Sequence, residues 1–218
     1  MKPRNKKQSC KKISKITAEV LINSQGGLCY TVEGEEYKNI LDSLPQIEIS
    51  LQKMGFPINV NFAITQFIIE CLRNAMKARG SKILSDKYGS FEKVLDIAEN
   101  PLTLINNTIT EAYKDTVITL IWENLPDTLV VSITNNTCLN EYLSYRIEKS
   151  LNRDHEITTE ELEEISSEKS IYNTKASGMG LGLWMVVQAV KDIGGKISFS
   201  SNSEITKFFL EIPKDKEK

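Results

Sequence analysis

The fold is decided by the stretch Ser177-Gly178-Met179-Gly180-Leu181-Gly182-Leu183-Trp184, near the C-terminal end of the 218-residue chain. Its three glycines alternate with other residues and lead into an apolar run that ends at Gly194-Gly195. This pattern predicts a glycine loop that opens a buried helix of about three turns, with a glycine cap at its C-terminal end. Glycines let backbone amides approach a ligand, and a helix N-terminus presents unpaired N–H groups. The stretch is therefore suited to holding a phosphate, although glycines before a helix are also ordinary turn chemistry.

A second helix, expected over residues 61–79, carries the other chemically informative side chains. Its apolar residues recur at intervals of three and four, which places them on one face against a core. Glu70, Asn74 and Lys77 lie on the opposite side at i, i+4 and i+7. A carboxylate, an amide and an ammonium group therefore share one narrow strip of the helix. A solvated polar face with an i, i+7 charge pair would give the same pattern.

The rest of the chain predicts further elements from its hydrophobic periodicity and turn residues. These are a β-hairpin over residues 18–32, an amphipathic helix from Glu35 to Met54 broken at Pro45, a β-hairpin over residues 116–133, a helix capped by Asn140, and a strand pair over residues 196–212. We expect one domain over residues 18–213, between a basic flexible tail at 1–17 and a charged tail at 214–218. Within the domain, residues 80–114 form an insertion and the acidic residues 152–177 a mobile lid.

Composition limits the functional classes. The chain is 40% hydrophobic and 26% charged, with a net charge of −2, which predicts a globular protein without a general attraction to nucleic acid. The basic first twelve residues are the one hint of such an interaction. No apolar run approaches the roughly 20 residues that span a bilayer, and no secretory signal begins the chain. The four cysteines lie far apart, which argues against a zinc site or a disulfide framework and favours the cytoplasm.

Two common nucleotide-binding plans are excluded by the sequence. A dinucleotide-binding site of the Rossmann type needs a strand directly before its glycines, but here a polar segment precedes them. A P-loop needs the sequence GK[ST], which the chain lacks.

Residues 38–212 resemble the GHKL superfamily of gyrase-type ATPases, heat-shock chaperone ATPases, histidine kinases and anti-sigma serine kinases. Three boxes carry the resemblance. Its N-box, E/N-x-x-x-N-A-x-K, is similar to Glu70-Cys71-Leu72-Arg73-Asn74-Ala75-Met76-Lys77. Its D-x-G-x-G box has the position of Ile133-Thr134-Asn135-Asn136-Thr137-Cys138-Leu139, and its GxGLGL box is similar to Gly178-Met179-Gly180-Leu181-Gly182-Leu183. The resemblance implies the Bergerat fold, an α/β two-layer sandwich with a mixed, mainly antiparallel sheet and helices on one face.

The resemblance also implies ATP and Mg²⁺ as cofactors and a role for each matching residue. Asn74 would ligate Mg²⁺ through its amide oxygen, Lys77 would lie near the phosphates, and Glu70 would be the general base. Asn135 would accept the adenine amino proton. The phosphates would be surrounded by backbone amides of the glycine box, at Gly178, Gly180, Leu181 and Gly182.

Three positions depart from the family pattern in the middle box. Asn135 replaces an aspartate, and Thr137 and Leu139 replace two glycines. A neutral acceptor makes a weaker bond than a charged one, which predicts about a tenfold loss of adenine affinity. The one histidine, His155, lies in the expected lid, so the phosphoacceptor helix of a sensor kinase is missing.

Two functions are consistent with these observations. The first is a cytoplasmic kinase or ATPase that acts on a partner protein, with Glu70 as the base. The second is a non-catalytic, nucleotide-gated or pseudo-ATPase module that regulates a partner. Glu70 favours the first, whereas Asn135, Thr137 and Leu139 favour the second.

Overall fold

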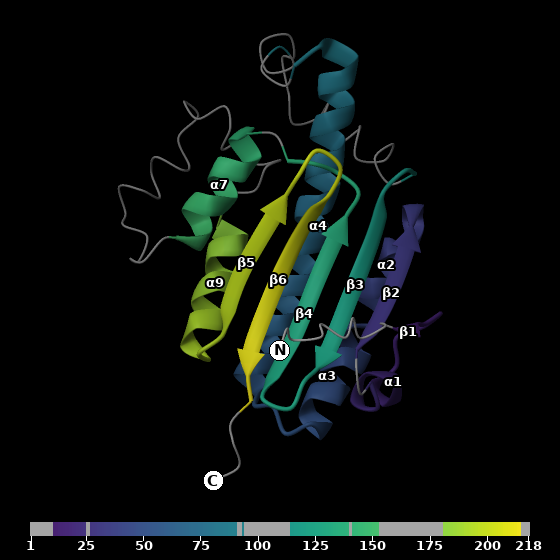
Figure 1. Ribbon diagram of the computed structural model, residues 1–218, viewed down its shortest axis with the longest axis vertical. Coiled ribbons are helices and arrows are strands. Elements are labelled where there is room, and N and C mark those ends of the chain that lie inside the picture. The colour runs from purple at the N-terminus through teal and green to yellow at the C-terminus, as the bar shows by residue number, and fades with distance from the viewer. Residues whose placement is uncertain are drawn as a thin grey trace, which may run out of the picture.

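The computed structural model of the chain describes residues 11–24, 27–90, 93, 114–139, 141–152 and 181–214. Six described strands form one sheet in the order β1-β2-β3-β4-β6-β5 (Figure 1). They are β1 (Lys11–Lys12), β2 (Leu28–Glu33), β3 (Val117–Asn124), β4 (Thr128–Asn135), β5 (Lys196–Ser201) and β6 (Thr206–Pro213). β1 runs parallel to β2, and every other neighbouring pair is antiparallel.

The described helices form the second layer. They are α1 (Ala18–Ile22), the 3-10 helix η1 (Gly34–Tyr37), α2 (Lys38–Asp42), α3 (Leu44–Lys53), α4 (Ile58–Tyr88), α7 (Glu141–Leu151) and α9 (Leu181–Asp192). In Figure 1, α3, α4 and α9 lie behind the sheet, whose opposite face turns toward the viewer. The predicted fold class, an α/β two-layer sandwich with a mixed, mainly antiparallel sheet, is therefore confirmed.

The core lies between the sheet and the helices, and the strands supply it by alternation, with Ser132 of β4 buried in addition. Every second residue of β3, beginning at Ile118 and ending at Trp122, is buried, and the same period of two appears in β2, β4 and β6. The largest fully buried side chains are Trp122, Phe67 and Phe208, from β3, α4 and β6. Each contributes about 1.5–3 kcal/mol by leaving water, so this interface holds the two layers together.

The prediction of a hairpin over residues 18–32 is wrong in its first half. Residues 18–22 form α1, because the Thr17 hydroxyl accepts a hydrogen bond from the backbone N–H of Val20 at 3.2 Å and caps the helix. Ala18 and Leu21 are buried at helical spacing. The second half, β2, is a strand as expected.

The helix that was expected to end near Gly80 continues for more than two further turns. α4 runs from Ile58 to Tyr88 and ends at Gly89, whose φ of +88° is the left-handed conformation of a helix C-cap. Ser81 and Leu84 are buried beyond Gly80. Their packing outweighs the cost of about 1 kcal/mol that a glycine imposes on a helix interior. The first part of the expected insertion, residues 80–88, is thus a helix extension.

The other predicted elements have their expected places. The amphipathic region 35–54 is divided between α2 and α3, with Pro45 in the first turn of α3, and both β-hairpins form. The expected basic tail at 1–17 is too long, since Lys11–Lys12 pairs with β2 and Ile16 is buried in the core. The predictions for residues 1–10, for most of the insertion (91–92 and 94–113), for the cap at Asn140, for residues 153–180, including His155, and for the tail beyond residue 214 lie outside the described residues.

Candidate functional site

The polar strip of α4 (Glu70, Asn74 and Lys77) lies on a helix whose other side is anchored in the core. Phe67, Cys71 and Ala75 are at most 1% exposed, which fixes the rotation of the helix about its axis. All three strip residues are half-buried rather than open to solvent. Glu70 forms an ion pair with Arg73, at i+3, whose own side chain is largely exposed.

The Glu70 carboxylate is the best-defined group of the strip. Its side chain is 12% exposed, and Oε1 accepts a hydrogen bond from Nη1 of Arg73 at 2.6 Å. On its other side it lies against Gly182, at the second position of α9. A Cβ at position 182 would come within 2.3 Å of Glu70 Oε2, closer than real Cβ contacts allow. The absence of a side chain at Gly182 is thus what lets α9 approach this carboxylate.

This contact joins two of the three predicted boxes. α9 begins at Leu181 and packs on α4 through its buried residues Leu183, Val186 and Val190. Its N-terminus therefore lies beside Glu70, and a negative charge is favourable at that end of a helix. Gly178 and Gly180 lie outside the described residues. The predicted glycine cap is present, because Gly194 has a φ of +68° and its N–H donates to the Lys191 carbonyl at 2.9 Å.

Cys71, next to Glu70 in the chain, is a core residue and not a reactive thiol. It is fully buried, and this desolvation raises the pKa of the Cys71 thiol well above its usual range, with the Glu70 charge adding to the shift. The thiol therefore stays protonated and packs as a small apolar group, as its place on the apolar face of α4 predicts.

Asn135 lies at the C-terminal end of β4, on the side of the sheet that faces α4. It continues the alternation of buried residues along the strand and is only 2% exposed. Its side-chain oxygen accepts the backbone N–H of Thr137 at 3.0 Å. In the next strand, the Thr206 hydroxyl donates to the Thr137 carbonyl at 2.8 Å. The residue expected at the nucleotide base is thus part of a compact turn, with Leu139 packed against the core beyond it.

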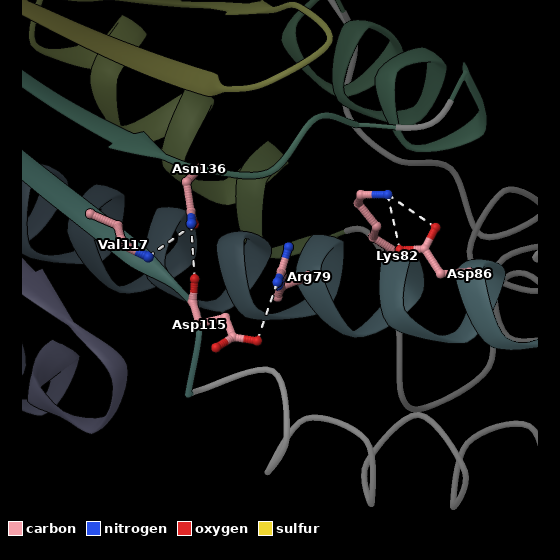
Figure 2. A network of polar contacts seen from close by, with 6 residues as sticks. All are labelled: Arg79, Lys82, Asp86, Asp115, Val117 and Asn136. Carbon is pink, nitrogen blue, oxygen red and sulfur yellow. Dashed lines mark hydrogen bonds and ion pairs between the residues drawn. The ribbon is translucent and has the colours of Figure 1, made fainter.

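The neighbouring Asn136 has a structural role that the sequence interpretation missed. Its side-chain oxygen accepts the N–H of Val117 at 2.9 Å, and its amide nitrogen donates to the Asp115 carbonyl at 2.8 Å (Figure 2). The Asp115 carboxylate in turn faces Arg79 of α4 at 3.5 Å. A second ion pair, Lys82–Asp86 at 3.0 Å, lies further along the same helix. Asn136 therefore closes the end of the β3–β4 ladder where the sheet meets α4.

Arg73 was also missed, and here the sequence did carry a signal. Arg73 lies at i+3 from Glu70, a spacing that brings opposite charges together on a helix surface. The network around Asn136 had no comparable signal, because it joins residues 19 and 21 positions apart that only the strand register brings together.

A hollow of about 630 Å³ lies apart from these residues, with Lys15, Tyr30 and Asp42 in its lining. Its size would suit a small ligand. However, Lys15 and Asp42 are exposed, and the hydroxyl of its buried Ser43 already donates to the Asn39 carbonyl of α2. The hollow shares no lining residue with the predicted site, so its position gives no support to a nucleotide there.

Comparison with other proteins adds no assignment: neither the protein-family models nor the curated proteins contain a match to this chain. None of the helices in the described part of the chain has the length and apolar character needed to cross a membrane.

Proposed function

We propose that this chain is a histidine-kinase-like ATPase-domain protein of the GHKL type, which binds Mg·ATP and acts as a kinase or ATPase on a partner protein. The observation that carries the proposal is the position of the Glu70 carboxylate against Gly182 at the beginning of α9. This contact brings Glu70, the acid–base candidate of α4, beside the N-terminus of α9, and Asn74 and Lys77 follow it along the same strip of α4. A helix N-terminus is a natural binding site for phosphate.

The donor set of the strip fits the proposed ligand. The Asn74 amide oxygen would hold Mg²⁺, which neutralises phosphate charge when bound, and Lys77 would add a positive point charge. Glu70 would take the proton from the attacking water or hydroxyl. Glu70 is held in place by the ion pair between its Oε1 atom and Nη1 of Arg73, at 2.6 Å. This ion pair weakens when the carboxylate accepts a proton and loses its charge.

A non-catalytic, nucleotide-gated regulatory module is the second candidate. It is favoured by the same ion pair, which engages the candidate base, and by the neutral Asn135 in place of an aspartate, since its oxygen accepts the Thr137 N–H within a turn. For both candidates we propose the cytoplasm, since Cys29, Cys71 and Cys138 are free thiols. The partner protein would contact the surface around the site.

Binding can be tested by calorimetric titration of Mg·ATP into the full chain. We expect wild-type protein to bind and Asn74→Ala to lose at least about tenfold in affinity, because a metal ligand is removed. Asn59→Ala, an exposed asparagine in the first turn of α4, is the matched control and should bind as wild type does. No heat change up to millimolar Mg·ATP would exclude both candidate functions.

Turnover of labelled ATP then separates the two candidates. If the chain is an enzyme, Glu70→Gln should lower turnover by about 10²-fold or more while Mg·ATP binding persists, because the amide cannot accept the proton. Binding without turnover in wild type and variant alike would favour the regulatory module.

A further inference from the structure

We infer that the open edge of β2 binds an extended segment of a partner protein, in which a lysine or arginine stands next to a bulky residue. The open edge consists of residues 31–33, on the side of the sheet that only the two-residue strand β1 borders (Figure 1). None of these residues belongs to the candidate nucleotide site, so binding here goes beyond the proposed function and does not depend on it.

β1 covers only the beginning of β2. Its pairing ends at Lys12 and Cys29, and the Ile13 N–H donates to the Cys29 carbonyl at 3.2 Å. Backbone groups of successive strand residues point to opposite edges, so those of Thr31 and Glu33 point to the same edge as those of Cys29. Within the described part of the chain, the Thr31 N–H and C=O and the Glu33 N–H form no hydrogen bond. Unpaired backbone groups at a sheet edge are a template for another strand.

The neighbouring strand β3 leads to the same orientation of the Thr31 backbone. Thr31 pairs with Thr119, and their hydroxyl oxygens lie 3.0 Å apart. The Val117 carbonyl points to β4, where it accepts the Asn136 N–H at 3.2 Å. Thr119, two positions further along β3, points the same way. The Thr31 backbone groups therefore have no partner on β3 and face the open edge.

Two hollows flank the open edge, one on each face of the sheet. The hollow on the outer face has a volume of about 390 Å³ and is lined by Lys12, Ile13, Cys29, Thr31, Glu33 and Glu36. The hollow of about 630 Å³ lies on the core side, because its lining includes the buried Tyr30. Successive side chains of a strand point to opposite faces. A peptide strand paired with the open edge would place one side chain in each hollow, which is how strand addition becomes selective.

The charges of the outer hollow favour a basic side chain. Glu33 and Glu36 are exposed, and among the described residues neither forms an ion pair. Lys12 is the one opposing charge in this lining, so an excess of negative charge remains. The hollow on the core side includes the apolar side chains of Ile16 and Tyr30, which suit a bulky neighbour in the peptide.

A second copy of the chain is a poorer occupant of the open edge. Since the unpaired backbone is confined to residues 31–33, a symmetric pairing of two copies would bring the two Glu33 carboxylates close together. Like charges on paired strands are destabilising. A basic peptide has the opposite effect at the same place.

Selection of a phage-displayed library of random seven-residue peptides on the full chain tests the inference. We expect enriched sequences with lysine or arginine next to an aromatic or large aliphatic residue. A synthetic peptide of the enriched sequence should bind in calorimetry. Thr31→Pro removes an N–H that makes no ladder bond, and should weaken peptide binding by at least about tenfold. Thr31→Val also loses the hydroxyl contact with Thr119 but keeps the N–H, so this matched control should bind as wild type does.

The place of binding is measured on wild-type protein, so that a loss of folding in Thr31→Pro, detected by thermal melting, does not decide the result. With the peptide bound, the amides of Thr31 and Glu33 should become protected from hydrogen exchange in NMR spectra. The Thr119 amide, which points to β4, should keep its exchange rate. Replacing both Glu33 and Glu36 with glutamine should remove the preference for a basic side chain.

Several results would overturn the inference. These are a selection that enriches no peptide, enriched sequences without a basic residue, and equal binding to folded Thr31→Pro. Unchanged exchange of the Thr31 amide would do the same. A wild-type dimer that Thr31→Pro converts to a monomer would show that a second copy occupies the open edge instead. None of these results bears on Mg·ATP, and failure of Mg·ATP to bind would leave the open edge of β2 unaffected.

Discussion

Gly182 owes its importance to one neighbour, the Glu70 carboxylate. The two residues come from different helices, and their contact is possible only because position 182 has no Cβ. Helical spacing was enough to predict that Glu70, Asn74 and Lys77 share a strip. The contact with Gly182 could not be predicted in the same way, since it depends on how closely α4 and α9 pack. The hydrogen bond from the Thr137 N–H to the Asn135 side-chain oxygen belongs to a local turn, a feature that sequence predicts more readily.

Replacing Gly182 with alanine tests this contact. Alanine normally stabilises a helix relative to glycine by up to about 1 kcal/mol. Here the added methyl group collides with Glu70, so we expect Gly182→Ala to lower the free energy of unfolding by about 1–3 kcal/mol. In a Glu70→Ala background the collision is gone, and the same change should become neutral or stabilising. Urea denaturation of the four proteins measures this change of sign, and equal effects in both backgrounds would contradict it.

The strands and helices differed in how well the sequence predicted them. The strands β3, β4, β5 and β6 were predicted correctly, because the alternation of apolar and polar residues in a strand follows from the two faces of the sheet itself. The prediction of a strand at residues 18–22 was wrong. Thr17 caps a helix there, and the Ala18 N–H donates a hydrogen bond to Gln46 of α3. These bonds override the strand preference of Val20 and Ile22. The predicted end of α4 was too early, because the packing of residues beyond Gly80 outweighs the cost of a glycine in the helix.

The hydrogen bonds of Asn136 at the end of the β3–β4 hairpin can be tested by mutation. Asn136→Ala removes two hydrogen bonds and leaves the Val117 N–H and the Asp115 carbonyl without them. We expect the free energy of unfolding to fall by about 1–3 kcal/mol. Asn124→Ala in β3 is the matched control, because the Asn124 side-chain oxygen is buried without a partner in the described part of the chain. Denaturant titration should show a clearly smaller loss for Asn124→Ala, and equal losses would contradict the role of Asn136.

The two layers share one continuous core, and Cys71 lies within it. Ionisation of this thiol would place a charge among apolar side chains, which is why burial holds its pKa well above the usual range. In the unfolded chain the thiol ionises at about pH 8.5. Above that pH the folded state binds more protons than the unfolded state, so the stability that Cys71 contributes is complete at lower pH and declines as the pH rises.

This decline of stability with rising pH leads to a prediction for the whole protein. Between about pH 8 and pH 9.5, the free energy of unfolding should fall more steeply for the protein with Cys71 than for Cys71→Ala, by on the order of 1 kcal/mol. Both proteins should carry serine at Cys10, Cys29 and Cys138, so that no other thiol titrates. Parallel pH profiles from denaturant titration would contradict a raised pKa at Cys71.

The length of α4 has a mechanical consequence. The helix has 31 residues, or about 46 Å, whereas the eight-residue strands extend for about 27 Å, and its upper turns stand clear of the sheet (Figure 1). Tyr88 lies about 27 Å along the axis from Glu70, so a tilt of roughly 5° pivoting there displaces the tip by about 2 Å. With its pivot at Glu70 in the candidate site, α4 acts as a lever whose long arm ends at Tyr88, and any tilt of the helix axis is largest at that end.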